Sequence, residues 1–266
     1  GEIKRVVSSL LMQIDNLPSH VMVIGATNHA ELLDRAVWRR FQVLNNVTMA
    51  RLGYIIMTMF EMQASHLFCF NVPVADNFRK CVGDYTENDV NSKAIEIFKA
   101  KPELSQLHIE LRREDGFSEF EGRTMDAAET SVKKVLTEEN ESVKFNYDYG
   151  DGWEIDLVLE KIYEDKTLLG KELPRVLDGQ GYGIIEDCGG PGGLENIIKA
   201  FKKEKGSQYE EYCEWLGVDD LDLSVFDIDD MNFRLKKVPR IFADAYECGL
   251  EPTKRSMDIL TRKYKK

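Results

Sequence analysis

The chain begins with two hydrophobic patterns of different period. In residues 6–14 apolar side chains recur at helical spacing until Asn16, Leu17 and Pro18, which predicts an amphipathic helix. Residues 21–26 (VMVIGA) then form a continuous apolar run, half of it β-branched, between polar neighbours. Such a run is typical of a strand that is buried on both faces, as in a parallel sheet. We therefore expect a helix–strand unit of α/β type in this part of the chain.

After residue 47 the chain alternates between helix-like and strand-like patterns. Thr48 is suited to cap the first of these helices, and Gly150, Asp151 and Gly152 join two strand-like runs as in a β-hairpin. Glycines crowd residues 179–193, which predicts an irregular loop. Together these patterns predict an α+β domain with a mixed or antiparallel sheet and flanking helices. The expected strands are 66–72, 107–113, 143–149 and 153–163, and the expected helices are 49–60, 194–203, 208–216 and 231–238.

The charge distribution argues against a general nucleic-acid surface. The formal net charge is −12, and an acidic surface repels a phosphate backbone. Residues 254–266 (KRSMDILTRKYKK) are the exception, because they are rich in lysine and arginine. We expect nucleic acid to bind only through this segment, if it binds at all, and the alternative is a solvated basic helix end.

The cysteines and the hydropathy indicate a cytoplasmic protein. The five cysteines form no CxxC pair, so reduced thiols are expected rather than a disulfide framework or a zinc ribbon. No run approaches the ~20 apolar residues that a membrane helix requires. We expect no association with a membrane.

Residues 1–43 resemble part of an AAA+ ATPase, in the stretch RVVSSLLMQIDNLPSHVMVIGATNHAELLDRAVWRRF. The resemblance implies that Asn28 is a sensor 1 residue and that Arg39 and Arg40 are arginine fingers, which would contact ATP. The alternative for Asn28 is a turn residue after a strand. No GxxxxGK[ST] loop occurs, and the Gly170-Lys171 pair is followed by glutamate. We therefore expect no ATP hydrolysis by this chain alone and no cofactor, except ATP in a complete ATPase.

From Val37 onward the chain resembles the plasmid pRiA4b ORF-3-like proteins. The motifs that carry the resemblance are VWRRFQV, TMARLGYII, SHLFCF, FNYDYGDGWEIDLVLE, EDCGGPGG and FDIDDMNFRLK. The family occurs on plasmids and transposable elements, which implies an association with mobile DNA. We expect two parts, 1–43 and 44–266, with a chimeric junction within residues 36–43. The first strand of the ORF-3-like sheet is missing, and residues 21–26 are expected to replace it.

Six side chains of the larger part could carry chemistry: His66, Asp148, Asp151, Glu186, Asp187 and Cys188. Imidazole, carboxylate and thiolate groups bind divalent metals and serve in acid–base catalysis. The alternatives are structural: Asp151 can be a turn residue, Glu186 and Asp187 can cap a helix, and His66 can pack against the core. We expect the loops 149–153 and 186–190 to lie at one end of the sheet and to line the principal pocket with His66.

Three functions remain open from the sequence. The first is a non-enzymatic accessory or binding module with a protein partner. The second is a metal-dependent enzyme that uses His66, Asp151, Glu186 and Asp187, with a divalent metal as its cofactor. The third is a part of an AAA+ ATPase fusion.

Overall fold

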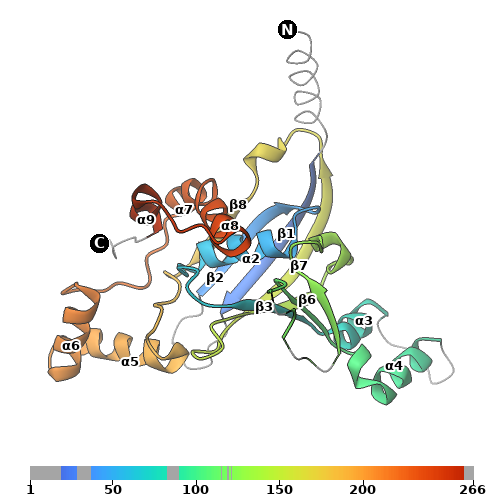
Figure 1. Cartoon of the computed structure of the whole chain (residues 1–266), viewed down its shortest axis with the longest axis horizontal. Coiled ribbons are helices and arrows are strands. Elements are labelled where there is room, and N and C mark those ends of the chain that lie inside the picture. Colours follow the sequence, from blue (N-terminus) through green and yellow to red (C-terminus); the bar gives the residue numbers. More distant parts are fainter. Residues whose placement is uncertain are drawn as a thin grey trace, which may run out of the picture.

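One mixed sheet organises the chain. The computed structural model describes residues 19–28, 37–82, 90–114, 116–118, 120 and 122–260. In these residues the sheet has eight strands in the order β5-β4-β3-β6-β7-β1-β2-β8 (Figure 1). Only β4 and β5 among them pair in parallel. The α+β class with a mixed sheet is thus confirmed. The strands are β1 (Ser19–Asn28), β2 (Val37–Leu44), β3 (Phe68–Val72), β4 (Leu107–Glu110), β5 (Arg123–Asp126), β6 (Ser142–Tyr147), β7 (Trp153–Asp165) and β8 (Arg175–Gln180).

The strand β1 contains the apolar run 21–26 and lies inside the sheet. It pairs with β2 on one side and with β7 on the other, and its residues Val21, Ile24 and Ala26 are buried. The prediction that 21–26 is a strand of this sheet is confirmed. The expected parallel direction was wrong, because both neighbours run antiparallel to β1. An apolar run indicates that a strand is buried on both faces. Burial does not determine whether the neighbouring strands run parallel or antiparallel.

The helix α2 (Met49–Met59) forms the centre of the core. Thr48 caps it as expected, since its Oγ1 accepts a hydrogen bond of 3.1 Å from the backbone N–H of Arg51. Almost every side chain of α2 is buried, because the sheet lies on one side and α7 and α8 cover the other (Figure 1). The other helices are α3 (Val74–Val82), α4 (Val90–Ala100), α5 (Gly190–Lys203), α6 (Ser207–Leu216), α7 (Ile228–Leu235), α8 (Val238–Cys248) and α9 (Lys254–Leu260), and short 3₁₀ turns lie at Pro102–Leu104, Val132–Lys134 and Gly170–Glu172.

Some expectations fall outside the residues that the structure describes. The helix expected at 6–14 is one of them, as are the last six residues of the basic C-terminal segment. The boundary expected between 43 and 44 falls within β2, whose strand belongs to the same sheet as the later strands. The described part of 1–43 is therefore structurally continuous with the rest. Among the described helices, none has the length and apolar character to cross a bilayer.

Candidate metal centre

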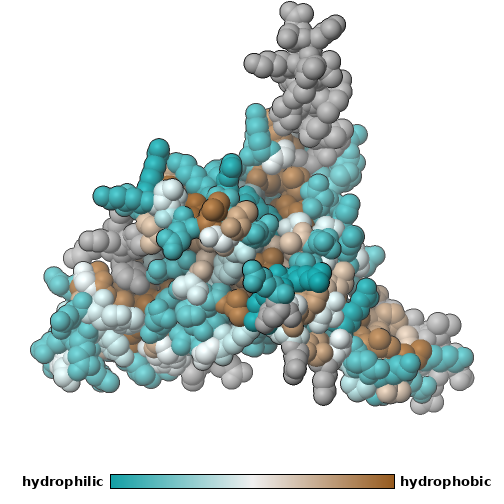
Figure 2. All heavy atoms as spheres, in the orientation of Figure 1, coloured by the Kyte–Doolittle hydropathy of each residue, from teal (hydrophilic) through white to brown (hydrophobic). Residues whose placement is uncertain are grey.

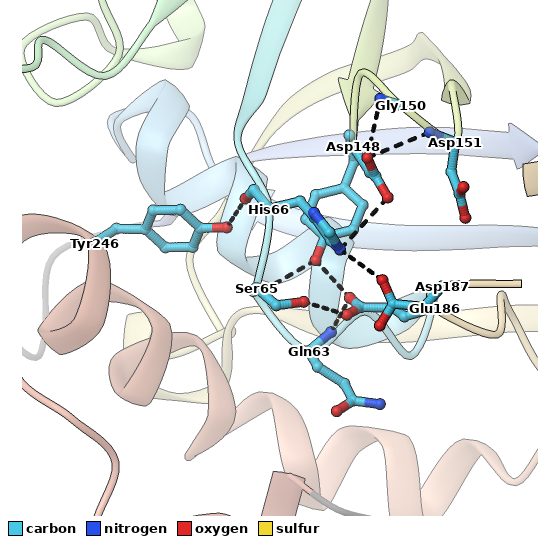
Figure 3. A network of polar contacts seen from close by, with 10 residues as sticks. Gln63, Ser65, His66, Asp148, Gly150, Asp151, Glu186, Asp187 and Tyr246 are labelled. Carbon is cyan, nitrogen blue, oxygen red and sulfur yellow. Dashed lines mark hydrogen bonds and ion pairs between the residues drawn. The ribbon is translucent and has the colours of Figure 1, made fainter. Parts of the chain in front are cut away.

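Three side chains from three separate loops converge at one end of the sheet. His66 lies between α2 and β3, Asp148 follows β6, and Asp187 lies between β8 and α5. The Nε2 atom of His66 is 3.4 Å from Oδ2 of Asp148 and 3.2 Å from Oδ1 of Asp187 (Figure 3). One potential ligand atom from each residue lies within 4.8 Å of the other two. Ligands of one metal ion require such spacing, because each sits ~2.0–2.6 Å from the ion.

A second set of three side chains, each one residue before a member of this cluster in the sequence, lies beneath it. The carboxylate of Glu186 accepts hydrogen bonds from the hydroxyl of Tyr147 at 2.5 Å, from the backbone N–H of Gln63 at 2.5 Å and from the hydroxyl of Ser65. The N–H of Ser65 in turn donates to the Tyr147 hydroxyl at 3.2 Å. Ser65, Tyr147 and Glu186, which we call the support triad, directly precede His66, Asp148 and Asp187. The triad therefore fixes the three backbones from which the cluster projects.

Burial sets the protonation of the two tyrosines that hold this region. Burial raises the pKa of Tyr147, and the negative charge of Glu186 raises it further. Burial and Glu186 also raise the pKa of Tyr246 on α8. Both phenols therefore stay neutral and can donate. Tyr246 donates its hydroxyl hydrogen to the backbone carbonyl of His66, so the His66 loop is held by α8 as well as by the support triad (Figure 3).

The turn after β6 orients Asp148. Its Oδ1 accepts the N–H groups of Gly150 at 3.0 Å and Asp151 at 3.3 Å, and its Oδ2 faces His66. The side chain of Asp148 is only 12% exposed, whereas that of Asp187 is 71% exposed. One carboxylate is thus fixed in the protein, and the other opens the cluster to solvent.

The two glycine-containing loops touch at the end of the sheet that carries His66, and the expectation that they line the principal pocket stays a prediction. A Cβ atom at Gly190, whose φ is +69°, would lie 2.1 Å from the backbone oxygen of Asp151. Only glycine permits this approach. The contact places the loop that carries Asp187 against the turn that carries Asp148.

The other candidate residues, Glu186, Asp151 and Cys188, do not belong to the cluster of His66, Asp148 and Asp187. Both oxygens of Glu186 accept hydrogen bonds within the support triad, so this residue supports the cluster from below. Asp151 contributes its N–H to Asp148, and its Oδ2 has no partner among the described residues. Burial and the charge of Asp151 raise the pKa of Cys188 to about 12, and its Sγ donates to the Gly190 carbonyl at 3.4 Å. The thiol therefore stays protonated.

The support triad was missed from the sequence, although one signal was present. In β6 the residues Val143, Phe145 and Tyr147 alternate with polar ones and are buried. A tyrosine on the apolar face of a strand must find a partner for its hydroxyl. That rule predicts a buried polar group opposite Tyr147, but it does not identify Glu186.

Arg39, one of the three ATPase-like residues, is held inside the protein by backbone contacts. Arg39 is fully buried, and burial lowers its pKa while the charge of Glu61 partly opposes that effect. Its five N–H groups all donate to backbone carbonyls, and its guanidinium lies over the Phe226 ring. An arginine finger must extend into another subunit's site, so the expectation for Arg39 has no support in this geometry. The carbonyls are those of Trp38, Met59, Gln180, Gly181 and Tyr182.

The other two ATPase-like residues lie on the paired strands β1 and β2. Arg40 forms an exposed ion pair of 2.5 Å with Glu160 on β7. Asn28 ends β1 opposite Val37 and is buried. Its Nδ2 has no partner among the described residues. A nucleotide-binding role for Arg40 and Asn28 stays a prediction.

The fold and the cluster define a class: an α+β protein with a mixed sheet and a histidine–carboxylate cluster at one end. Residues 29–234 match the family described as plasmid pRiA4b ORF-3-like protein, and the chain belongs to that family. Residues 1–49 match the ATPase family associated with various cellular activities. Both resemblances seen in the sequence are confirmed, and the two matches overlap around β2. The strand β1 precedes the ORF-3-like match yet forms part of its sheet.

Two relatives and one solved structure are similar to parts of this chain. The uncharacterized protein y4hQ of Sinorhizobium fredii is 28% identical over 148 residues, which are 53% of this chain and 75% of that protein. The uncharacterized AAA family ATPase y4kL of the same organism is 51% identical over 41 residues, 15% of this chain and 12% of that protein. The chain thus spans a small part of the ATPase. The crystal structure of a protein of unknown function, MM3350 from Methanosarcina mazei Go1, has the same fold at a TM-score of 0.57 and 22% identity, over 79% of this chain and 97% of that one.

Proposed function

We propose that the chain is a divalent-metal-binding domain whose ligands are His66, Asp148 and Asp187. One observation carries this proposal: each ligand directly follows a member of the buried support triad, so three distant loops present their side chains to one point. Two carboxylates that face a single ring nitrogen repel each other. A bound cation removes that repulsion, and the fixed backbones reduce the entropy lost on binding.

The ligand set favours a transition-metal ion such as Zn²⁺ or Mn²⁺. An imidazole nitrogen suits Zn²⁺, and two carboxylates suit Zn²⁺ and Mn²⁺. Three protein ligands leave at least one coordination position for water or a substrate, and the exposed Asp187 lies at the open side. An ion held in this way acidifies bound water and supplies a nucleophile for hydrolysis. We propose metal-assisted hydrolysis as the reaction class.

Metal titration of the purified chain tests the proposal. After chelation, calorimetric titration with Zn²⁺ and separately with Mn²⁺ should show one site in the wild type, and Asp148→Asn should weaken binding at least tenfold. Asp165→Asn is the matched control. Asp165 also accepts backbone hydrogen bonds in a turn, but it lies at the opposite end of β7. Equal binding by the wild type and Asp148→Asn would contradict the proposal.

A second candidate function is an accessory module with a protein partner. The helix α4 carries the large apolar side chain Ile97, which is exposed. Figure 2 shows hydrophobic side chains gathered near α3 and α4 among hydrophilic surface. Exposed apolar patches favour binding to another protein. If the titration shows that neither Zn²⁺ nor Mn²⁺ binds, the accessory module becomes the better proposal. We place either function in the cytoplasm, because all five cysteines are free thiols.

A further inference from the structure

A pocket of about 470 Å³ lies beside the candidate metal centre, and none of the three proposed ligands lines it. It is enclosed by residues 67–68 around the start of β3, by residues 110–114 at the end of β4, by Tyr149 and by the last turn of α8. Its volume is within the range of ~300–1,000 Å³ that is usual for ligand sites. Leu67 directly follows His66, and Tyr149 directly follows Asp148. The pocket and the metal centre therefore share these two segments as a wall.

Aromatic and aliphatic side chains form the apolar part of the pocket. The ring of Tyr246 stacks on that of Tyr54, with centroids 5.7 Å apart and planes at 18°, and it meets the ring of Phe68 edge to face at 5.4 Å. These contacts fix one side of the pocket before any ligand binds, which lowers the entropy lost on binding. Leu67 and Tyr149 are 47% and 53% exposed. They leave apolar surface open to a ligand.

The last turn of α8 contributes hydrogen-bond acceptors to the pocket. Oε1 of Glu247 accepts the hydroxyl of Tyr54 at 2.9 Å, and this bond orients the carboxylate. The backbone carbonyls of Tyr246, Glu247 and Cys248 accept no backbone hydrogen bond from the described residues, because the last carbonyls of a helix lack a partner within it. A ligand that contacts this turn therefore needs N–H donors.

Arg112 contributes a cation to the same pocket. It is exposed, and its guanidinium has no hydrogen-bond or ion-pair partner in the part of the chain that the structure describes. The neighbouring Arg113 already donates to the hydroxyl of Ser118 at 3.3 Å. A guanidinium binds a carboxylate through two parallel hydrogen bonds. A polyanion is disfavoured, because three glutamates also line the pocket. The expected anionic group of the ligand is therefore a single carboxylate.

We propose that this pocket binds the carboxyl-terminal residues of a peptide whose last side chain is apolar. The carboxylate pairs with Arg112, and the last side chain packs against Leu67 and Tyr149. The peptide N–H groups donate to Glu247 and to the carbonyls that end α8. Inorganic phosphate has no apolar part and a fatty acid has no N–H donors, whereas a peptide carboxyl terminus supplies all three groups. No side chain of the pocket is a proposed metal ligand, so this inference goes beyond metal binding.

Calorimetric titration of the full chain, freed of metal by a chelator, with the peptide acetyl-alanyl-leucine tests the proposal. The wild type should bind it saturably, and Arg112→Gln should bind it at least about tenfold more weakly, because a charged hydrogen-bond pair is lost. The carboxyl-terminal amide of the same peptide should lose a similar factor with the wild type. Arg79→Gln on α3 is the matched control, because it also removes an exposed arginine, and the ion pair of Arg79 with Asp76 lies outside the pocket. It should bind the peptide as the wild type does.

Two further ligands test the other parts of the assignment. Acetyl-alanyl-aspartate should bind at least about tenfold more weakly than acetyl-alanyl-leucine, because its last side chain is charged. Free leucine should also bind more weakly, because it lacks the preceding residue. The proposal is overturned if the wild type binds no peptide, if the acid and the amide bind equally, if Arg112→Gln binds like the wild type, or if either further ligand matches the leucine peptide. Since no metal is present in this titration, its result is independent of whether Zn²⁺ or Mn²⁺ binds at the metal centre.

Discussion

The hydroxyl of Tyr147 donates to the carboxylate of Glu186 at 2.5 Å, inside the protein and across 39 residues of sequence. The next residues, Asp148 and Asp187, both direct carboxylate oxygens at His66. The buried bond thus joins the two segments whose next residues form the candidate metal centre together with His66. Because a buried hydrogen bond to a charged group resists distortion, it holds the two ligands in place before any ion binds.

We predict that Glu186→Gln weakens metal binding although Glu186 is not a ligand. The neutral amide cannot accept the hydrogen bonds of Gln63, Ser65 and Tyr147 together, because its NH₂ group only donates. Substitution of a residue that supports metal ligands typically lowers the metal affinity about 10- to 100-fold. Calorimetric titration with Zn²⁺ measures the loss.

The control for this experiment is Glu195→Gln on α5, which removes a partly exposed i,i+4 ion pair with Lys199. It should leave the affinity unchanged. Circular dichroism of each variant checks that the fold is retained. If Glu186→Gln folds and binds Zn²⁺ as tightly as the wild type, the support triad does not position the ligands.

Substitutions of Arg39 and Arg40 should differ sharply in how much they lower the free energy of unfolding. Arg39→Leu leaves five backbone carbonyls without their donor inside the protein, and such a loss costs on the order of 3 kcal/mol or more of unfolding free energy. Arg40→Gln removes one exposed ion pair, which is worth about 0–1 kcal/mol. Urea unfolding measures both values. Equal effects would show that the buried contacts of Arg39 are not a main source of stability.

The sequence predicted the parts of the candidate site that depend on local pattern. Gly150 and Gly152 identified the turn beside Asp148, and residue chemistry selected His66 and Asp187 as possible ligands. The support triad depends instead on the pairing of segments 121 residues apart, as between Ser65 and Glu186. No local pattern encodes such a pairing. The direction of β1 was missed for the same reason, since it depends on its partners β2 and β7.

We predict that this chain shows no saturable binding of ATP at micromolar concentration. Its 266 residues contain no GxxxxGK[ST] loop to hold the phosphates. Arg39 is also committed to backbone carbonyls and is not free to contact a phosphate. Titration with a fluorescent ATP analogue, with and without Mg²⁺, measures binding. A saturable, Mg²⁺-dependent signal would show that the ATPase-like segment keeps a nucleotide site.

Two neighbouring glycines offer a matched test of the contact between the site loops. At Gly190 an added Cβ would meet the backbone oxygen of Asp151 at 2.1 Å, and the residue has a φ of +69°. At Gly192 nothing lies within 4 Å of such a Cβ, so that position tolerates a side chain. Gly190→Ala must therefore push the loop that carries Asp187 away from the turn that carries Asp148.

We expect Gly190→Ala to lower both stability and metal affinity. The strained backbone costs about 1–3 kcal/mol, and the displaced Asp187 no longer shares an ion with His66 and Asp148. Gly192→Ala should change metal binding little and change stability by no more than ~1 kcal/mol, because it adds a methyl group in open space within α5. Thermal unfolding and Zn²⁺ titration of both variants make the comparison. If Gly190→Ala loses stability but keeps the wild-type affinity, the metal ligands do not depend on this contact between the loops.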